Sequence, residues 1–198
     1  MLLLSLCSLA SAQSWPDRPV KIIVPYAAGG GVDPVARLVS LKLADIWKQP
    51  VVVENKAGGS GTIGANFVAK SPSDGLTILM SATAEVVINQ HFMQKMAYNP
   101  DVDLKPVTLL VKLPFVLVTN PSKPYSTAAE LIAYAKKNPK KLDYASTGPG
   151  SASHLAGELL DDMAGIDTVH VPYKGGAPAL QDLLGGRVAA YFSTYSTS

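Results

Sequence analysis

The chain repeats one short pattern, in which an apolar run rich in β-branched residues is followed by a glycine-containing turn and a helix-like segment. The first copy is "KIIVP" at 21–25, followed by three consecutive glycines and by apolar residues at helical spacing over 35–46. Strands that alternate with helices in this way predict mainly parallel sheets covered by helices on both faces. We therefore expect an α/β fold.

The pattern recurs through both halves of the chain. Asp33 is expected to cap the first helix with Pro34 at its first helical position, and Thr127 with Glu130 forms a capping box before another helix. Residues 85–105 show no clear pattern. Strands are expected at 21–25, 51–54, 76–80, 115–119, 142–146, 168–171 and 188–193.

The length of 198 residues, 47% of them hydrophobic, is enough for two small domains with a core each. We expect domain 1 at 13–105 and domain 2 at 106–198. The first half has only three clear strands, and the final "VAAYFSTYSTS" stops soon after an apolar strand. The second lobe is therefore expected to be incomplete, with the sequence truncated at its C-terminal end.

The N-terminus is expected to be a signal peptide at 1–12. It contains an apolar run, "LLLSLCSL", followed by the cleavage pattern Ala10-Ser11-Ala12, although no basic residue precedes that run. Removal of this segment would remove Cys7, the only cysteine, so disulfides and thiolate metal sites are excluded. The net charge of +2, with scattered lysines, argues against a nucleic-acid surface.

Ligands of open parallel sheets bind where the strands end. The residues that follow the predicted strands are almost all glycines, hydroxyls and amides, with no Asp–His, Glu–Glu or Cys–His combination among them. General acid–base and nucleophilic catalysis both need such a partner, so we expect binding and no enzymatic activity. These strand-end positions are Tyr26 and the glycines after it, Asn55, Ser81, Thr83, Asn120, Ser146, Thr147, Tyr173, Lys174 and Ser193.

Two glycine-rich turns are candidate anion loops. In "AAGGGVDP" (27–34), the glycines permit close backbone approach, and the following helix N-terminus favours a carboxylate or phosphate. A plain tight connection would need only one glycine. "TGPGSASHL" (147–155) repeats this logic, with Ser151 or Ser153 as the helix cap. It lacks the G-x-S-x-G pattern of a nucleophile elbow, and His154 is interpreted as a packed side chain more readily than as a catalytic base.

Other motifs are set aside. The G-x-G-x-x-G match at 59–64 lies four residues after the strand, and the next strand ends in Ser81-Ala82, without the acidic residue a dinucleotide site needs. No Walker motif is present, and the histidines have no partners at metal-ligand spacing. No cofactor and no metal are therefore expected. Lys174 either reaches an anion or lies in solvent, and the sequence leaves both open.

Several segments, in order, resemble the Bug family, the periplasmic solute-binding proteins of tripartite tricarboxylate transporters. They are "WPDRPVKIIVPYAAGGGVDPVARLV", "VVVENKAGGSGTIGANFVAKSPSDGLTILM", "GPGSASHLAGELL" and "VPYKGGAPALQDLLGGRV", which together run from about Trp15 to Arg187. The resemblance implies a two-domain clamshell of the type II periplasmic-binding kind, with mixed, mostly parallel sheets. It also implies a small organic carboxylate ligand: a di- or tricarboxylate, an aromatic acid or an acidic amino acid.

The resemblance further implies the ligand-binding residues, with the first-domain loop and the 147–154 loop facing each other and the Ser81–Thr83 segment lining the cleft floor. It implies a periplasmic monomer of a Gram-negative bacterium that delivers its ligand to a membrane permease. A ligand sensor for a membrane signalling system and an exported α/β hydrolase remain as alternatives. The implied ligand-binding residues are Tyr26, Ala27, Ala28, Gly29, Gly30, Gly31, Asp33, Ser81, Thr83, Thr147, Gly148, Gly150, Ser151, His154 and Tyr173.

Overall fold

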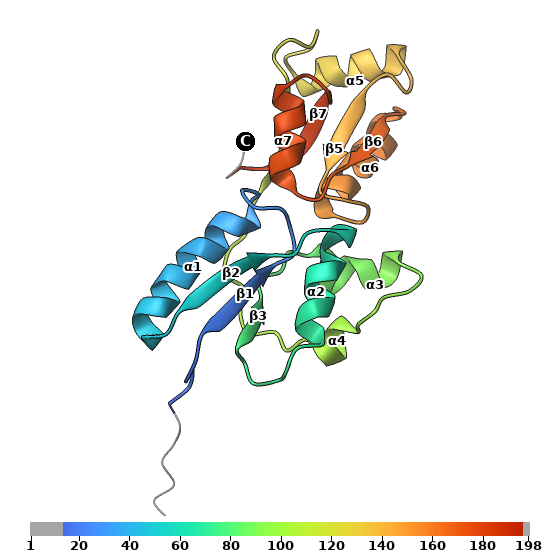
Figure 1. The fold of residues 1–198 in the computed structure, drawn as a ribbon. Helices are drawn as coiled ribbons and strands as arrows, with labels where there is room; N and C mark the ends of the chain where they lie inside the picture. The colour runs from blue at the N-terminus through green and yellow to red at the C-terminus, as the bar shows by residue number, and fades with distance from the viewer. Residues whose placement is uncertain (1–13, 196–198) are drawn as a thin grey trace, which may run out of the picture.

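The computed structural model describes residues 14–195, so the expected signal peptide at 1–12 lies outside the described residues. The described residues form two α/β lobes, one above the other in Figure 1. An irregular segment at 104–114 separates them in the sequence, and the expected domain boundary at 105/106 lies there and stays a prediction. Within residues 14–195, no helix combines the length and apolar character that crossing a bilayer requires.

The first lobe is built on a three-stranded parallel sheet of order β2-β1-β3. Ile22 and Val24 of the central strand pack with Ala36 of α1, and partly buried apolar residues of α1 complete this core. Helices α1 and α2 lie on opposite sides of the sheet (Figure 1). The elements are β1 (Val20–Val24), α1 (Val32–Trp47), β2 (Val51–Asn55), α2 (Thr62–Ala69) and β3 (Thr77–Leu79).

The segment that showed no sequence pattern folds into three short helices with irregular connections. A π-helix, η2 (Ala84–Ile88), runs directly into α3 (Asn89–Phe92), and α4 (Pro100–Asp103) follows. A 3₁₀ turn, η1 (Gly59–Gly61), precedes α2. Helices of a single turn carry no recognisable apolar period, which explains why periodicity could not reveal them.

The second lobe contains a four-stranded sheet of order β4-β7-β5-β6. Strand β5 is parallel to both β6 and β7, while β4 is antiparallel to β7, so the expected mixed, mostly parallel sheet is confirmed. Buried Leu131 and Tyr144 belong to one core cluster, and Leu183 with Tyr191 to another. The elements are β4 (Phe115–Thr119), α5 (Ala128–Lys137), β5 (Asp143–Ser146), α6 (Ala152–Ala164), β6 (Val169–Pro172), α7 (Gly176–Leu184) and β7 (Ala190–Thr194).

Two predicted helix caps have different outcomes. The capping box of Thr127 and Glu130 is confirmed at the start of α5. The prediction for Asp33 is wrong, because α1 begins two residues earlier than expected, at Val32 instead of Pro34, with Gly31 as its N-cap. Asp33 instead lies in the first turn, where its buried carboxylate accepts a hydrogen bond from the N–H of Gly29. The acidic side chain therefore supports the preceding loop rather than the helix end.

Candidate functional site

The side chain of Asp33 supports the first glycine loop, 26–31, by hydrogen bonding to its backbone. The Asp33 Oδ2 atom lies 3.0 Å from the Gly29 N–H and 2.9 Å from the Arg37 Nε atom. Asn55, at the end of β2, donates to Asp33 Oδ1 at 2.8 Å and to the Tyr26 carbonyl at 3.1 Å. Burial opposes ionisation of Asp33, but the hydrogen bonds from Arg37, Gly29 and Asn55 keep its pKa below the ordinary value. Asp33 is thus an ionised side chain that supports the loop, and Arg37 already neutralises its charge.

A buried carboxylate, Glu85, joins the ends of β1 and β3. It accepts a hydrogen bond from the Tyr26 hydroxyl at 2.6 Å and another from the Ala82 N–H at 2.6 Å. Ser81 and Thr83, the predicted cleft residues on either side of Ala82, are exposed. Burial raises the pKa of Glu85 despite these two hydrogen bonds, and burial also raises the pKa of Tyr26. No sequence signal pointed to this role, because Glu85 lies in the segment without a pattern.

Replacing Glu85 by Gln is expected to change how stability depends on pH. A carboxyl whose pKa is raised in the folded state adds stability that is fully present below its unfolded value, about 4.3, and is lost as pH rises through the folded value. Glu85→Gln removes that loss, so the free energy of unfolding of the variant relative to the wild type should rise as the pH increases above about 4.3. Urea unfolding at pH values on both sides of this point measures the difference; parallel profiles for the two proteins would contradict it.

In the second loop, most backbone donors are used inside the loop itself. The N–H of Thr147 donates to Ser153 Oγ, that of Gly148 to Ser146 Oγ, and that of Gly150 to His154 Nδ1, at 3.0, 3.0 and 3.1 Å. Ser151 caps α6 by accepting from the His154 N–H, as the sequence predicted for Ser151 or Ser153. This loop is therefore held in shape by its own hydroxyls and by an imidazole.

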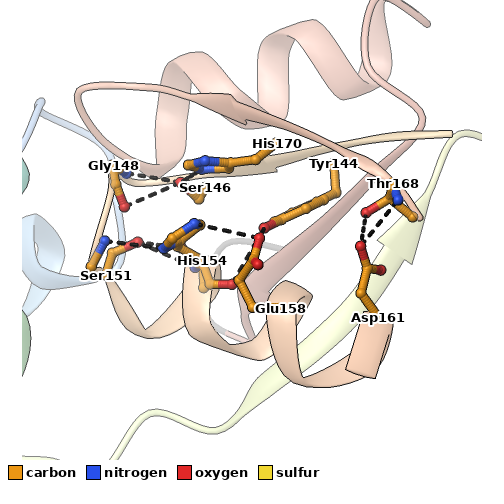
Figure 2. A network of polar contacts seen from close by, with 11 residues as sticks. Tyr144, Ser146, Gly148, Ser151, His154, Glu158, Asp161, Thr168 and His170 are labelled. Atoms are coloured by element: carbon orange, nitrogen blue, oxygen red, sulfur yellow. Dashed lines mark hydrogen bonds and ion pairs between the residues drawn. The ribbon is translucent and has the colours of Figure 1, made fainter. Parts of the chain in front are cut away.

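Figure 2 shows two histidines beside this loop, and only one of them was considered for the site from the sequence. The rings of His154 and His170 have centroids 4.1 Å apart, and His170 also stacks on Tyr144. Burial, and secondarily the charge of His154, lowers the pKa of His170 to about 4. Strand β6 carries His170 beside β5 in parallel register, opposite Tyr144, a pairing that sequence spacing did not reveal.

A serine–histidine pair also forms at the end of β5, so one strand-end hydroxyl does have a neighbouring base that was not evident from the sequence. Ser146 Oγ lies 2.6 Å from His170 Nε2. Ser146 is fully buried, and the same oxygen accepts a hydrogen bond from the Gly148 N–H. A nucleophile needs an open approach for its substrate, which this hydroxyl lacks. The pair is therefore a support for the loop.

Replacing His170 by Gln is expected to reduce the loss in the free energy of unfolding that occurs as the pH becomes acidic. The folded pKa of about 4 lies below the unfolded value of about 6.5, so His170 adds stability above about pH 6.5 that is lost as pH falls towards 4. Gln places an amide near the Nε2 position and cannot be protonated in this range. Denaturant unfolding between about pH 4 and about pH 7 tests this; an unchanged acid slope in the variant would contradict it.

Each predicted loop contacts the other lobe, but the direct partner of each loop is a different turn of the chain. The Ala27 N–H donates to the Lys174 carbonyl at 3.1 Å, and a Cβ atom on Gly30 would lie 3.3 Å from the Gly176 nitrogen. The 147–154 loop meets η1, where Ser60 Oγ donates to the Pro149 carbonyl at 2.5 Å. The structure therefore places the first loop against the turn before α7, and the second loop against the turn before α2.

Several residues of these contacts were not among the predicted site residues. Ser60 lies in the G-x-G-x-x-G match, and its φ of +53° presents its hydroxyl to Pro149 across the lobes. A Cβ atom on Gly31 would lie 2.5 Å from Thr194 Oγ1, which places the end of β7 beside the first loop. The glycines of "AGGSG" and "YKGG" did mark the turns before α2 and α7 as candidate binding segments in the sequence. The sequence alone did not show which loops would meet.

Tyr173 and Lys174 have different positions in the turn before α7. The Tyr173 hydroxyl donates to Asp182 of α7 at 2.7 Å, and burial together with this carboxylate raises the pKa of Tyr173 to about 12. The hydroxyl is thus directed into its own lobe. Lys174 is exposed, and its carbonyl accepts the hydrogen bond from Ala27. The backbone of this turn, more than its side chains, faces the first lobe.

The contact between the lobes brings two helix N-termini together, those of α1 and α7 (Figure 1). In the part of the protein that the structure describes, the N–H groups of Gly30, Gly31 and Val32 have no hydrogen-bond acceptor, and neither do those of Gly176 and Ala177. Unpaired N–H groups carry the positive end of a helix dipole. Two such ends that face each other are stabilised by an anion between them.

One other possible site, on the first lobe, is less suited to a small anion. An open hollow of about 920 Å³ lies between the end of β2 and α2, and Lys56, Phe67 and Lys70 are among its lining residues. It lies on the first lobe alone, and the Lys56 ammonium already sits 4.2 Å from the centre of the Phe67 ring. Among residues 14–195, no three His, Cys, Asp or Glu side chains gather as metal ligands would.

Comparison with known proteins identifies the family. Residues 35–198 match the family described as "Tripartite tricarboxylate transporter family receptor" (TctC). A Pseudomonas sp. (strain P51) relative, the "UPF0065 protein in tcbD-tcbE intergenic region", is 43% identical over 88% of this chain and 52% of its own length. Protein BugT of Bordetella pertussis is 41% identical over 91% of this chain and 56% of its own length. The chain thus spans about half the length of these relatives.

Solved structures share the fold. "R. palustris Rpa4515 with adipate" superposes with a TM-score of 0.90 at 38% identity, over 93% of this chain and 62% of that one. MatC (Rpa3494) from Rhodopseudomonas palustris with bound malate gives a TM-score of 0.85 at 34% identity, over 91% and 61%. The periplasmic binding protein BugD is 38% identical with a TM-score of 0.81. With the resemblance to the Bug family confirmed in this way, the chain belongs to the tripartite tricarboxylate transporter receptor family.

Proposed function

We propose that this protein is a periplasmic receptor that captures a small organic carboxylate between its two lobes and delivers it to the permease of a tripartite transporter. One observation carries the proposal: the N-termini of α1 and α7, from different lobes, meet with unpaired N–H groups. Neither loop contains an arginine, so the anion would be held by backbone donors. Charge-assisted hydrogen bonds to such donors contribute about 1.5–3 kcal/mol each.

Two hydrogen bonds between the lobes give a physical basis for the capture and release of the ligand. Ala27 donates to Lys174, and Ser60 donates to Pro149, across the two lobes. Both hydrogen bonds must break when the lobes separate by a hinge motion and must form again when they close. An anion between α1 and α7 would neutralise the two helix dipoles and so favour the closed arrangement. Binding and closure would then be one coupled equilibrium without any covalent step.

The ligand class is supported by two solved structures with this fold, one with adipate and one with bound malate. Both ligands are linear dicarboxylates. The residues that we propose to contact the ligand are those whose polar groups remain available: the backbone of Ala28, Gly30 and Gly31 in the first lobe and of Gly176 and Ala177 in the second, and the exposed hydroxyls of Ser81 and Thr83, which follow β3. Asp33, Gly29 and His154 would act one step behind them, because their polar groups are already paired.

Thermal unfolding in the presence of candidate ligands tests this function. Adipate, malate, citrate, glutamate and benzoate cover the ligand classes considered, and adipamide serves as the uncharged control. A ligand at 100 times its Kd stabilises the folded state by about 2.7 kcal/mol, which raises Tm by about 5–11 °C for a protein of this size. We expect at least one carboxylate to produce such a shift and adipamide to produce none. No shift with any of the carboxylates would overturn the proposal.

A further inference from the structure

The loop 147–151 is supported by two histidines that lie beside it. His154 is on α6 and His170 is on β6, and their ring centroids are 4.1 Å apart (Figure 2). His154 Nδ1 accepts the Gly150 N–H at 3.1 Å, and His170 Nε2 lies 2.6 Å from Ser146 Oγ, which accepts the Gly148 N–H. Each ring therefore holds one glycine of the loop, the first directly and the second through a serine.

The hydrogen bond from Gly150 fixes the chemical form of His154. An imidazole nitrogen accepts a hydrogen bond only when it carries no proton, so Nδ1 is bare and the proton is on Nε2. The Nε2 atom lies 3.5 Å from Glu158 Oε1, which is consistent with that assignment. A proton added to Nδ1 would place two donors, Nδ1–H and the Gly150 N–H, at a distance where they repel each other.

The groups that face His154 come from four elements. His170 of β6 is the nearest titratable ring, and Glu158, one turn further along α6, is the nearest carboxylate. Tyr144 of β5 donates to the same Glu158 carboxylate at 2.6 Å. Phe92 of α3 contacts the His154 ring edge to face, with centroids 6.1 Å apart, and carries no charge. Protonation would therefore place a cation between a histidine and a carboxylate that is already hydrogen-bonded.

We propose that His154 is a positioning residue that holds the Gly150 amide, and with it the loop 147–151, only while its ring is neutral. Protonation then releases this end of the loop. The hydrogen bond and its loss do not depend on what the protein binds. The consequence for affinity rests on the proposed function: a loop released in this way would hold a carboxylate less well, because its N–H groups and the start of α6 would no longer be preorganised.

Two substitutions of His154 separate the loss of the hydrogen-bond acceptor from the gain of a proton. His154→Asn keeps an oxygen acceptor close to the Nδ1 position and cannot be protonated, whereas His154→Ala removes the acceptor. His91→Asn is the matched control, because His91 is exposed and is the remaining histidine of the three in the sequence. Backbone amide protection factors of Gly150 and Ser151, measured by NMR without ligand, report whether the loop is held.

In the wild type and in His91→Asn, we expect the Gly150 protection factor to fall at least about tenfold between a pH at which the NMR signals of the His154 ring show it neutral and a pH at which they show it protonated. His154→Asn should keep high protection throughout, and His154→Ala should have low protection throughout. A pH response in His154→Asn equal to that of the wild type, or normal protection in His154→Ala, would overturn the proposal. Calorimetric titration with adipate and malate at both pH values then tests affinity; a wild type that binds neither would count against the proposed function, while the amide data would still decide the role of His154.

Discussion

Gly30→Val is expected to weaken carboxylate binding by at least about 100-fold, equivalent to about 2.7 kcal/mol. A Cβ atom at this position would lie 3.3 Å from the Gly176 nitrogen and 3.5 Å from the Ala27 carbonyl oxygen. A branched side chain adds two methyl groups to that crowded position. It would separate the N-termini of α1 and α7, where we propose that the anion lies. Calorimetric titration with the carboxylate that shifts Tm most measures the loss.

The fold should survive the Gly30→Val substitution, because no positive φ is found at Gly30 and the nearest atom belongs to the other lobe. We expect the free energy of unfolding without ligand to stay within about 1 kcal/mol of the wild type. Leu38→Val, at an exposed position on α1 outside the proposed binding residues, is the control for a β-branched substitution near the loop and should bind nearly normally. Wild-type affinity in Gly30→Val would show that the ligand does not need the close approach of α1 to α7.

Gly157→Val is expected to cause the largest loss of stability, about 3 kcal/mol, which corresponds to a decrease in Tm of about 6–12 °C. A Cβ atom at Gly157 would overlap Cε2 of Tyr144, closer than any real Cβ contact. The tyrosine ring cannot move away easily, because it stacks on His170 and its hydroxyl donates to Glu158. Helix α6 would have to shift from the sheet.

Leu159→Val controls for a β-branched residue in the same helix, at an exposed position. We expect that variant to lose less than about 1 kcal/mol, since only helix propensity changes. Urea unfolding gives both values. Comparable losses in the two variants would mean that the contact between Gly157 and Tyr144 does not set how closely α6 packs against the sheet. The two histidines beside the second loop would then be supported in another way.

The sequence predicted the architecture well because its signals are local. Apolar runs and helical spacing located the seven strands and the longer helices between them, and the Thr127–Glu130 pair located a helix start. The cap at Asp33 was misplaced because an acidic residue before proline fits either an N-cap or the first turn. Its partners, Gly29 and Asn55, decide between these, and Asn55 lies 22 residues away in the sequence.

The contacts that shape the candidate site depend on pairings between distant segments. Glu85 meets Tyr26 from 59 residues away, and Ser60 meets Pro149 from 89 residues away. The stacking of His170 on Tyr144 follows from the register of β5 with β6. No local pattern encodes such pairings. The glycine loops themselves were visible as candidate binding segments, while their opposite partners were set by how the two lobes pack.

The central claim, that unpaired backbone donors between the lobes hold an anion, predicts that binding depends on ligand charge. Calorimetric titration of the wild type with adipate, malate and adipamide under identical conditions tests it most directly. We expect a dicarboxylate to bind with a Kd in the micromolar range, about −8 kcal/mol, and adipamide to bind at least about 100-fold more weakly. Equal affinity for adipate and adipamide, or no measurable binding of either dicarboxylate, would contradict the claim.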